Sequence, residues 1–144
     1  MPTIEERFSA ALYKTARSWR HALDRRLKHL GVGQAGWLAI AVIAKASHPL
    51  SQTELADLLT LEDPTVVAMI DRLVKAVYVS RVPSPTDRRV KLVVLTTAGN
   101  QLYGKVKTEV DAYRAEVLAN IDADKLRAAT ELLETLQAAA ESTI

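Results

Sequence analysis

The residues whose types and spacing could do chemistry are charged side chains in the middle of the chain. Asp87, Arg88 and Arg89 follow the turn-prone segment Pro83-Ser-Pro-Thr86, which predicts a loop. Two adjacent guanidinium groups repel each other, so we expect Asp87 to pair with one arginine and brace the loop. The other arginine would then be free to reach a phosphate or a minor groove of DNA. The alternative is a solvated loop with a surface ion pair, which contributes less than about 1 kcal/mol.

Other kinds of chemistry have little support in the sequence. The chain has no cysteine, which excludes disulfides, thiolate metal ligands and cysteine nucleophiles. His21, His29 and His48 are widely spaced and form no His-x-x-x-His pair. Glycine-rich phosphate loops and a Gly-x-Ser-x-Gly elbow are absent as well. We therefore predict no catalytic residue, no metal site and no cofactor, and a protein that is not an enzyme.

Two short helices precede the charged loop and would position it. Ser51 and Glu54 have the spacing of a capping box, which predicts a helix from there through Leu59. Asp63 and Pro64 predict the start of a second helix, because aspartate caps free amides and proline suits the first helical position. Such a pair predicts a helix-turn-helix, whose second helix enters the major groove. The alternative is two amphipathic helices that simply pack together.

The hydrophobic period changes after the second helix. Residues 66–77 carry an apolar stripe at helical spacing, which we expect to be buried as far as Val77. Residues 78–82 and 89–95 are rich in β-branched side chains and predict two strands. The result is a β-hairpin, or wing, with the Asp-Arg-Arg sequence at its tip.

The two ends of the chain predict long helices that need a covering surface. Residues 4–30 carry apolar side chains every three or four positions, and Gly31 follows where a helix-ending glycine belongs. Residues 34–46 are apolar nearly all round and predict a central core helix. Thr96 and Asp122 are expected to cap two further amphipathic helices. Because a long amphipathic helix cannot bury its own stripe, a partner surface is implied.

Composition and charge fit a globular protein that could hold a nucleic acid. The 144 residues are 49% hydrophobic and 25% charged, an ordinary balance for one folded module. The longest apolar run, residues 37–44, is far short of the roughly 20 residues of a membrane span. Since the first residues also lack the features of a signal peptide, we expect a cytoplasmic protein without membrane association. Lysine and arginine exceed acidic residues only in residues 1–100, which allows a basic surface there.

The motifs taken together resemble the MarR family of bacterial and archaeal regulators. The segments that carry the resemblance are Leu50-Ser-Gln-Thr-Glu-Leu-Ala56, Asp63-Pro-Thr-Val-Val67, Ile70-Asp-Arg-Leu73, Pro85-Thr-Asp-Arg-Arg89 and Leu95-Thr-Thr-Ala-Gly99. The resemblance implies a mainly α fold with a small β-hairpin, a winged helix-turn-helix that dimerises through its terminal helices. It also implies a homodimer on a palindromic operator in double-stranded DNA, and release of the DNA by a small aromatic or phenolic effector.

The expected organisation is one structural domain in three parts. Residues 1–30 form an N-terminal dimerisation helix, residues 31–95 the winged helix-turn-helix lobe, and residues 96–144 the C-terminal dimerisation helices. The expected DNA-binding residues are Ser51, Gln52, Pro64, Thr65, Ala68, Arg72, Arg88 and Arg89, with Asp87 as the brace of the wing. The family's ligand cleft lies between the dimer helices and the DNA-binding lobe, where aromatic walls and an arginine would suit an aromatic carboxylate. The candidates for that cleft are Tyr13, Arg17, Trp19, Arg20 and Trp37, and the alternative for both tryptophans is the core.

The sequence departs from the family pattern at the second helix. Ala68 stands where the family commonly has a base-reading arginine, and alanine offers at most a methyl contact to thymine. Glu62 and Asp63 bring carboxylates to the helix end that should meet phosphates. Val77 replaces a helix-ending glycine, so we expect a different helix end or strain there. We therefore expect a transcriptional regulator, a repressor with little direct readout from this helix. The alternative is a winged-helix module that has lost specific DNA binding and sequesters a related regulator.

Overall fold

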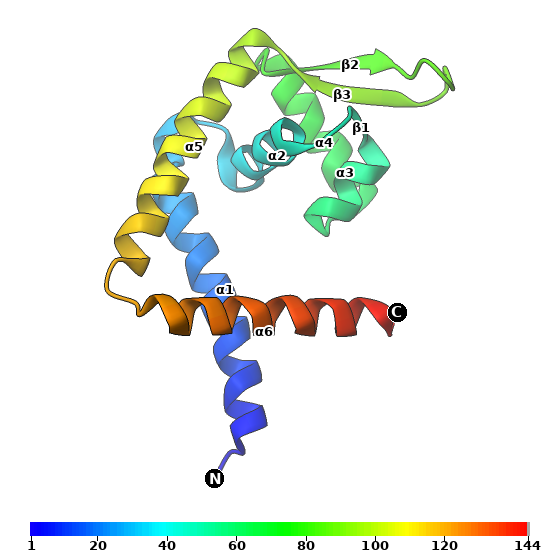
Figure 1. Cartoon of the computed structure of the whole chain (residues 1–144). Helices are drawn as coiled ribbons and strands as arrows, with labels where there is room; N and C mark the ends of the chain where they lie inside the picture. Colours follow the sequence, from blue (N-terminus) through cyan, green and yellow to red (C-terminus); the bar gives the residue numbers. More distant parts are fainter. Residues whose placement is uncertain (144) are drawn as a thin grey trace. The chain divides into compact units, whose positions relative to one another are not determined.

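The computed structural model describes residues 1–143, except the side chains of residues 34 and 35. Ile144, the last residue of the expected C-terminal part, lies outside the described residues. The chain divides into two units, Met1–Asp111 and Ala112–Ile144, and each is described by itself. Over the described residues, four helices are followed by a β-hairpin and two more helices, which confirms the expected winged helix-turn-helix class (Figure 1).

The first helix ends before the position that its apolar pattern suggests. Helix α1 (Ile4–Arg26) begins at a capping box made by Thr3 and Glu6. A short 3-10 helix, η1 (Lys28–Leu30), follows it and replaces the last expected turn of α helix. Gly31 then takes a φ of 74°, as expected of the glycine that ends this segment.

Three helices build the core of the first unit together with the end of α1. Helices α2 (Gly33–Lys45), α3 (Gln52–Leu59) and α4 (Asp63–Lys75) contribute most of its buried side chains. The largest fully buried side chains are Leu27, Ile40, Leu55, Val66, Ile70, Val79, Val93 and Val106. The apolar character of α2 is explained by this central position, as the sequence predicts.

The beginnings of α3 and α4 differ in their capping. The Ser51 side chain accepts from the Glu54 amide at 3.1 Å, and the Glu54 carboxylate accepts from the Ser51 amide at 3.1 Å, so the predicted capping box is confirmed. The prediction that Asp63 caps α4 is wrong. Glu62 is the N-cap residue, without a side-chain hydrogen bond, and Pro64 lies one position further into the first turn.

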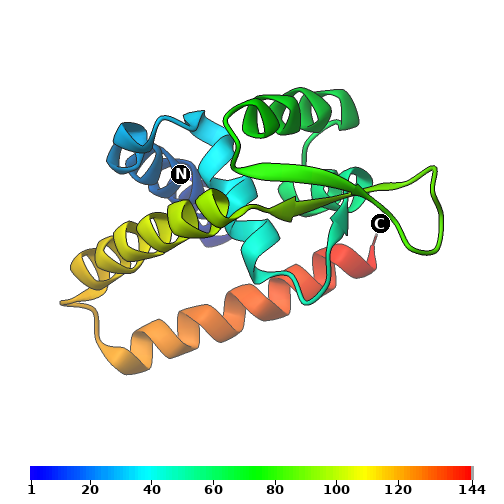
Figure 2. The same cartoon turned by 90° about the horizontal axis from the view of Figure 1, so that it is seen from above.

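The sheet has three antiparallel strands in the order β1-β3-β2. Strand β1 (Leu50–Ser51) pairs with β3 (Lys91–Leu95), which also pairs with β2 (Val79–Pro83). The predicted hairpin is confirmed, while the short strand β1 was not expected. In both ribbon views the β2–β3 hairpin projects beyond the helices of the first unit (Figures 1 and 2).

The corner between α4 and β2 is strained at one residue. Val77 has a φ of 69°, a conformation that β-branched residues rarely adopt, so the expectation of strain is confirmed. Two hydrogen bonds close the corner, from the Val77 amide to the Val74 carbonyl at 2.9 Å and from the Tyr78 amide to the Leu73 carbonyl at 3.0 Å. The Val77 side chain is 64% exposed, which contradicts its predicted burial, because the turn carries it away from the α4 stripe.

Helix α5 (Thr97–Leu118) is joined to this corner at its first turn. The Thr96 hydroxyl accepts from the Gly99 amide at 3.0 Å and donates to the Val77 carbonyl at 2.6 Å. The predicted cap at Thr96 is therefore confirmed. A Cβ at Gly99 would lie 2.0 Å from the carbonyl oxygen of Tyr78, so only glycine permits this close approach.

The second unit is dominated by α6 (Ala123–Ser142). The Asp122 carboxylate accepts from the Asp124 amide at 2.7 Å and caps the helix as predicted. Within the described chain, no side chain of α6 is buried. Its apolar stripe, which includes Leu133 and Leu136, is therefore exposed.

Candidate nucleic-acid interface

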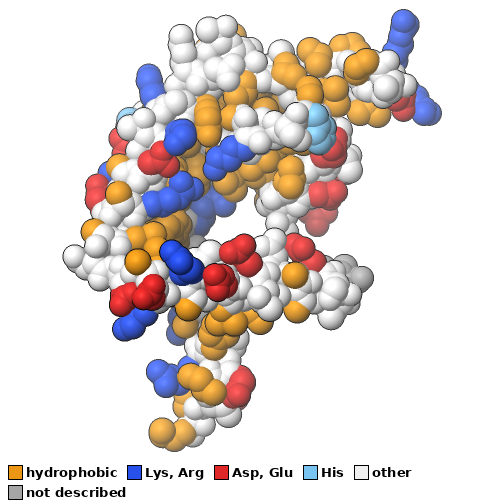
Figure 3. Space-filling view, in the orientation of Figure 1, with side chains coloured by type: hydrophobic (Ala, Val, Ile, Leu, Met, Phe, Trp, Pro, Cys, Tyr) orange, Lys and Arg blue, Asp and Glu red, His pale blue; other side chains and the backbone are white. Residues whose placement is uncertain are grey.

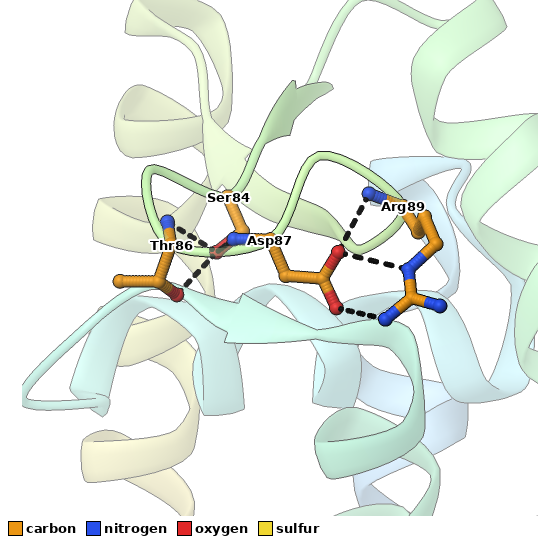
Figure 4. Close-up of polar contacts among 4 residues, drawn as sticks. All are labelled: Ser84, Thr86, Asp87 and Arg89. Carbon is orange, nitrogen blue, oxygen red and sulfur yellow. Dashed lines mark hydrogen bonds and ion pairs between the residues drawn. The ribbon is translucent and has the colours of Figure 1, made fainter.

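The tip of the wing is a loop held by its own side chains (Figure 4). One oxygen of Asp87 accepts from the Arg89 amide and from Arg89 Nε, both at 3.1 Å, and the other accepts from Arg89 Nη2 at 3.2 Å. The Ser84 hydroxyl oxygen accepts from the amides of Thr86 and Asp87, at 3.3 and 3.4 Å. These contacts fix the loop through local bonds between residues two or three positions apart.

The loop presents positive charge to solvent. The Arg89 side chain, and then the Arg89 amide, hold the pKa of Asp87 below its ordinary value of 3.8. Arg89 remains 91% exposed despite this pairing. Arg88 is exposed too, and among the described residues its side chain has no hydrogen-bond or ion-pair partner. Basic side chains extend outward from the end of the wing (Figure 3).

The exposed face of α4 is the second part of the site. Thr65, Ala68 and Arg72 follow one another at steps of three and four residues and therefore share one face of the helix. All three are exposed, and so is Pro64, while the buried residues of the helix lie on another face. Arg72 supplies the only guanidinium of this set, so the face offers few hydrogen-bond donors to base edges.

The N-terminal turn of α4 carries negative charge. Glu62 and Asp63 are both exposed, and the N-cap position has no side-chain hydrogen bond. The two carboxylates interact favourably with the positive end of the helix dipole. They would repel a phosphate at the same end, so this turn is poorly suited to hold the DNA backbone.

The first turn of α3 is tied to both α4 and the wing by Arg81 of β2. Arg81 Nε donates to the amide oxygen of Gln52 at 2.8 Å. Arg81 Nη2 donates to the Asp71 carboxylate at 2.6 Å and to the Val67 carbonyl at 3.4 Å. Ser51 precedes Gln52 at the N-cap, where its hydroxyl oxygen is already an acceptor. Ser51 and Gln52 were both expected to bind DNA, and of the two only the Gln52 side chain is oriented by a contact with another element.

Sequence reasoning missed Arg81 and Asp71. Arg81 is the one charged residue in the predicted strand 78–82, and Asp71 lies ten positions earlier in the preceding helix. A charged side chain inside a strand was the available signal. Its partners could not be identified from the sequence, because they come from two separate helices.

Two of the five candidate ligand residues contact each other in the first unit. The Arg20 guanidinium lies 5.2 Å from the centre of the Trp37 ring, a distance typical of a cation–π contact. The indole Nε1 of Trp37 donates to Asp24 at 2.7 Å, and Asp24 also lies 3.5 Å from Arg20 Nε. Trp37 is only 5% exposed. The tryptophan and the arginine are therefore packed against each other, and Asp24 satisfies the indole.

The other three candidates lie at the surface of α1. Tyr13 is 80% exposed, Arg17 is exposed, and Trp19 is half-buried. An open groove of about 610 Å³ in this unit contains none of the five candidates. It is lined by His29, Leu30, Tyr78, Gln101, Leu102, Gly104, Lys105, Thr108 and Glu109.

The described chain has neither a metal-binding cluster nor a membrane-spanning helix. In residues 1–143, no three His, Asp or Glu side chains are grouped so that they could hold a metal ion. No helix in the same range combines the length and apolarity needed to cross a membrane.

Comparison with known proteins relates this fold to a family. The model of the MarR family matches residues 39–91. The solved structure of the transcriptional regulator PA3341 is 34% identical, with a TM-score of 0.88 over 94% of this chain and 98% of that one.

Two more distant structures share the fold. MarR from Staphylococcus aureus, solved in complex with salicylate and kanamycin, is 21% identical, with a TM-score of 0.86 over 98% of this chain and 95% of that one. CouR from Rhodococcus jostii RHA1, bound to p-coumaroyl-CoA, is 20% identical, with a TM-score of 0.81 over 94% of this chain and 95% of that one. Because one relative is 34% identical over nearly the whole chain and the family model covers the helix-turn-helix and the wing as far as the start of β3, this chain belongs to the MarR family and has the winged-helix fold of its transcriptional regulators.

Proposed function

We propose that this chain is a sequence-specific transcriptional repressor without catalytic activity, which binds a palindromic operator as a homodimer. The observation that carries the proposal is the braced wing tip beside an exposed second helix of a helix-turn-helix. Arg88 extends into solvent there without a partner in the described chain, while Asp87 holds Arg89. Arginine on a projecting loop is suited to a narrow minor groove, whose negative potential attracts it.

Each element would have its own part on the DNA. Helix α4 would lie in the major groove, with Pro64, Thr65 and Ala68 nearest the base edges and Arg72 reaching a phosphate. Ser51 and Gln52, at the start of α3, would donate to the backbone of the duplex. Since α4 offers few donors, the wing and the deformability of the operator would supply much of the specificity.

The homodimer is supported by exposed apolar side chains on the terminal helices. In α1, Ile4 is 66% and Leu12 is 42% exposed, and in α6 Leu133 is 43% exposed. Stripes of this kind are usually covered in a stable protein, and a second copy of the same chain would cover them symmetrically.

A small aromatic acid is the effector that we propose. Solved relatives hold salicylate and p-coumaroyl-CoA, which both contain an aromatic ring. In this chain the Arg20 guanidinium, whose side chain is 38% exposed above the buried Trp37 ring, would pair with the carboxylate of such a ligand. Tyr13, Arg17 and Trp19 complete the proposed set, and such a ligand would release the DNA.

One observation favours a second function, a module that sequesters a related regulator. The α4 turn carries Glu62 and Asp63, and Ala68 stands at an exposed position where an arginine would read bases. A heterodimer formed through the terminal helices would need no DNA contact from any of these residues.

The test is fluorescence anisotropy of the purified protein with duplex DNA from upstream of its own gene. A scrambled duplex of equal length is the control, and both are measured at several salt concentrations. Nanomolar affinity that prefers the native duplex and falls steeply with salt would support a sequence-specific DNA-binding regulator. Weak binding, equal for both duplexes, would contradict it and favour the sequestering module.

A further inference from the structure

Arg81 joins the three elements that the proposed function places on DNA. It lies on β2 of the wing, and its guanidinium reaches Gln52 at the start of α3 and Asp71 in α4, at 2.8 and 2.6 Å. Its side chain is only 26% exposed, and a third contact ends on the Val67 carbonyl. The Arg81 guanidinium is therefore committed to contacts within the lobe.

The contact with Arg81 determines which way the Gln52 amide points. Arginine has only donors, so the Gln52 atom that faces it must be the amide oxygen. The two N–H donors of Gln52 are then left facing away from Arg81, and none has a partner in the described chain. Glutamine reads adenine by using its oxygen and its nitrogen together. With its oxygen held by Arg81, Gln52 is suited to donate to a phosphate instead.

The contact with Asp71 removes a negative charge from the same surface. The Asp71 side chain is 59% exposed on α4, the helix that would approach the DNA. An unpaired carboxylate there would repel the phosphates. The ion pair with Arg81 neutralises the Asp71 carboxylate, so Arg81 and Asp71 together carry no net charge.

We propose that Arg81 is a positioning residue for DNA binding: it orients the Gln52 amide so that its N–H groups donate to an operator phosphate, and it neutralises Asp71 beside that contact. The proposal rests on the proposed function, because it assigns Gln52 a phosphate on the operator.

Four variants separate this role from simple support of the fold. Arg81→Met removes all three contacts of the guanidinium, and Gln52→Ala removes the donor. Gln52→Glu keeps an acceptor for Arg81 but replaces the N–H donors with an oxygen. Asp71→Asn leaves the Gln52 contact in place and is the matched control. Thermal melts identify any variant that does not fold.

We expect Gln52→Ala to weaken operator binding about tenfold and Arg81→Met to weaken it at least as much, because Arg81→Met also leaves Asp71 unpaired. The double variant should be no weaker than Arg81→Met alone. Because the Gln52 donor carries no charge, Gln52→Ala should leave the salt dependence of log K unchanged. Gln52→Glu should fold as well as the parent and bind DNA more weakly than Gln52→Ala. Asp71→Asn should bind at least as well as the parent.

Three results would overturn the inference. They are parent-like affinity of Arg81→Met, additive losses in the double variant, and parent-like affinity of Gln52→Glu. Because Gln52→Glu does not alter Arg81, it tests the inference even if Arg81→Met fails to fold. A parent that prefers no duplex would overturn the proposed function and this inference together. If the parent binds its operator and the Arg81 and Gln52 variants bind it equally tightly, the inference alone is overturned.

Discussion

Val77 links the recognition helix α4 to the wing in a backbone conformation that suits glycine. Its φ of 69° costs a β-branched residue on the order of 1–3 kcal/mol, and its carbonyl is held by the Thr96 hydroxyl. The family resemblance indicated either a different helix end or strain here, because a valine stands where the family has a helix-ending glycine. The contacts of Arg81 were not predictable, since they join residues 29 and 10 positions apart and depend on how the helices pack.

Val77→Gly should stabilise the protein. The valine side chain is 64% exposed, so little buried surface is lost, while the strain at positive φ is relieved. We expect the free energy of unfolding to rise by about 1 kcal/mol, measured by urea denaturation. Val77→Ala keeps a Cβ at the same φ and should gain much less. A fall in stability for Val77→Gly would show that the corner is not strained.

Gly99→Ala should have the opposite effect. The new Cβ would lie 2.0 Å from the Tyr78 carbonyl oxygen, and a backbone atom cannot be moved aside by a rotamer change. We expect a loss of about 2 kcal/mol in the free energy of unfolding. Gly104→Ala in the same helix is the control, because its Cβ would meet open space and alanine favours helix. Equal effects of the two substitutions would contradict the close approach at Gly99.

At the scale of elements, local patterns were reliable wherever a helix start is decided by neighbouring residues. The capping box at Ser51 and the cap at Thr96 are confirmed, because their partners lie within three residues. Strand β1 was missed because its two residues become a strand only by pairing with β3, far along the chain. The start of α4 was misplaced by one residue, since Glu62 and Asp63 are both acceptable caps.

The α3 cap should make stability depend on pH in the acid range. The Ser51 amide, and then His48, lower the pKa of Glu54 from its ordinary value of 4.5. A depressed folded pKa means that the stabilisation is present above pH 4.5 and is lost as pH falls through the folded pKa. In urea titrations, Glu54→Gln should therefore be less stable than the parent at neutral pH, and the difference should shrink in acid. A difference that does not change with pH would contradict this account of the cap.

At the scale of the whole molecule, the proposed dimer depends on surfaces at both ends of the chain. Phe8 in α1 and Leu133 in α6 are 38% and 43% exposed. The sequence indicated that such stripes need a cover. It could not identify the cover, because a stripe shows only that apolar surface is available.

Phe8→Glu and Leu133→Glu should each dissociate the dimer. A carboxylate buried in an apolar interface without a partner is strongly unfavourable, whereas the same side chain on an exposed helix face of the monomer is not. We expect sedimentation velocity at micromolar concentration to show a dimer for the parent and monomers for both variants. Leu58→Glu, at a 59% exposed site in α3, is the control and should stay dimeric. A monomeric parent would contradict the proposed homodimer.

The central claim is that the wing tip holds DNA, and it is tested most directly by removing its two arginines. Operator binding is measured by fluorescence anisotropy for the parent, for Arg88→Ala/Arg89→Ala and for Arg25→Ala/Lys28→Ala. The third protein loses the same charge at exposed positions near the end of α1. We predict that the wing variant loses specific binding while the control stays close to the parent. A wing variant that binds the operator as tightly as the parent would contradict the account.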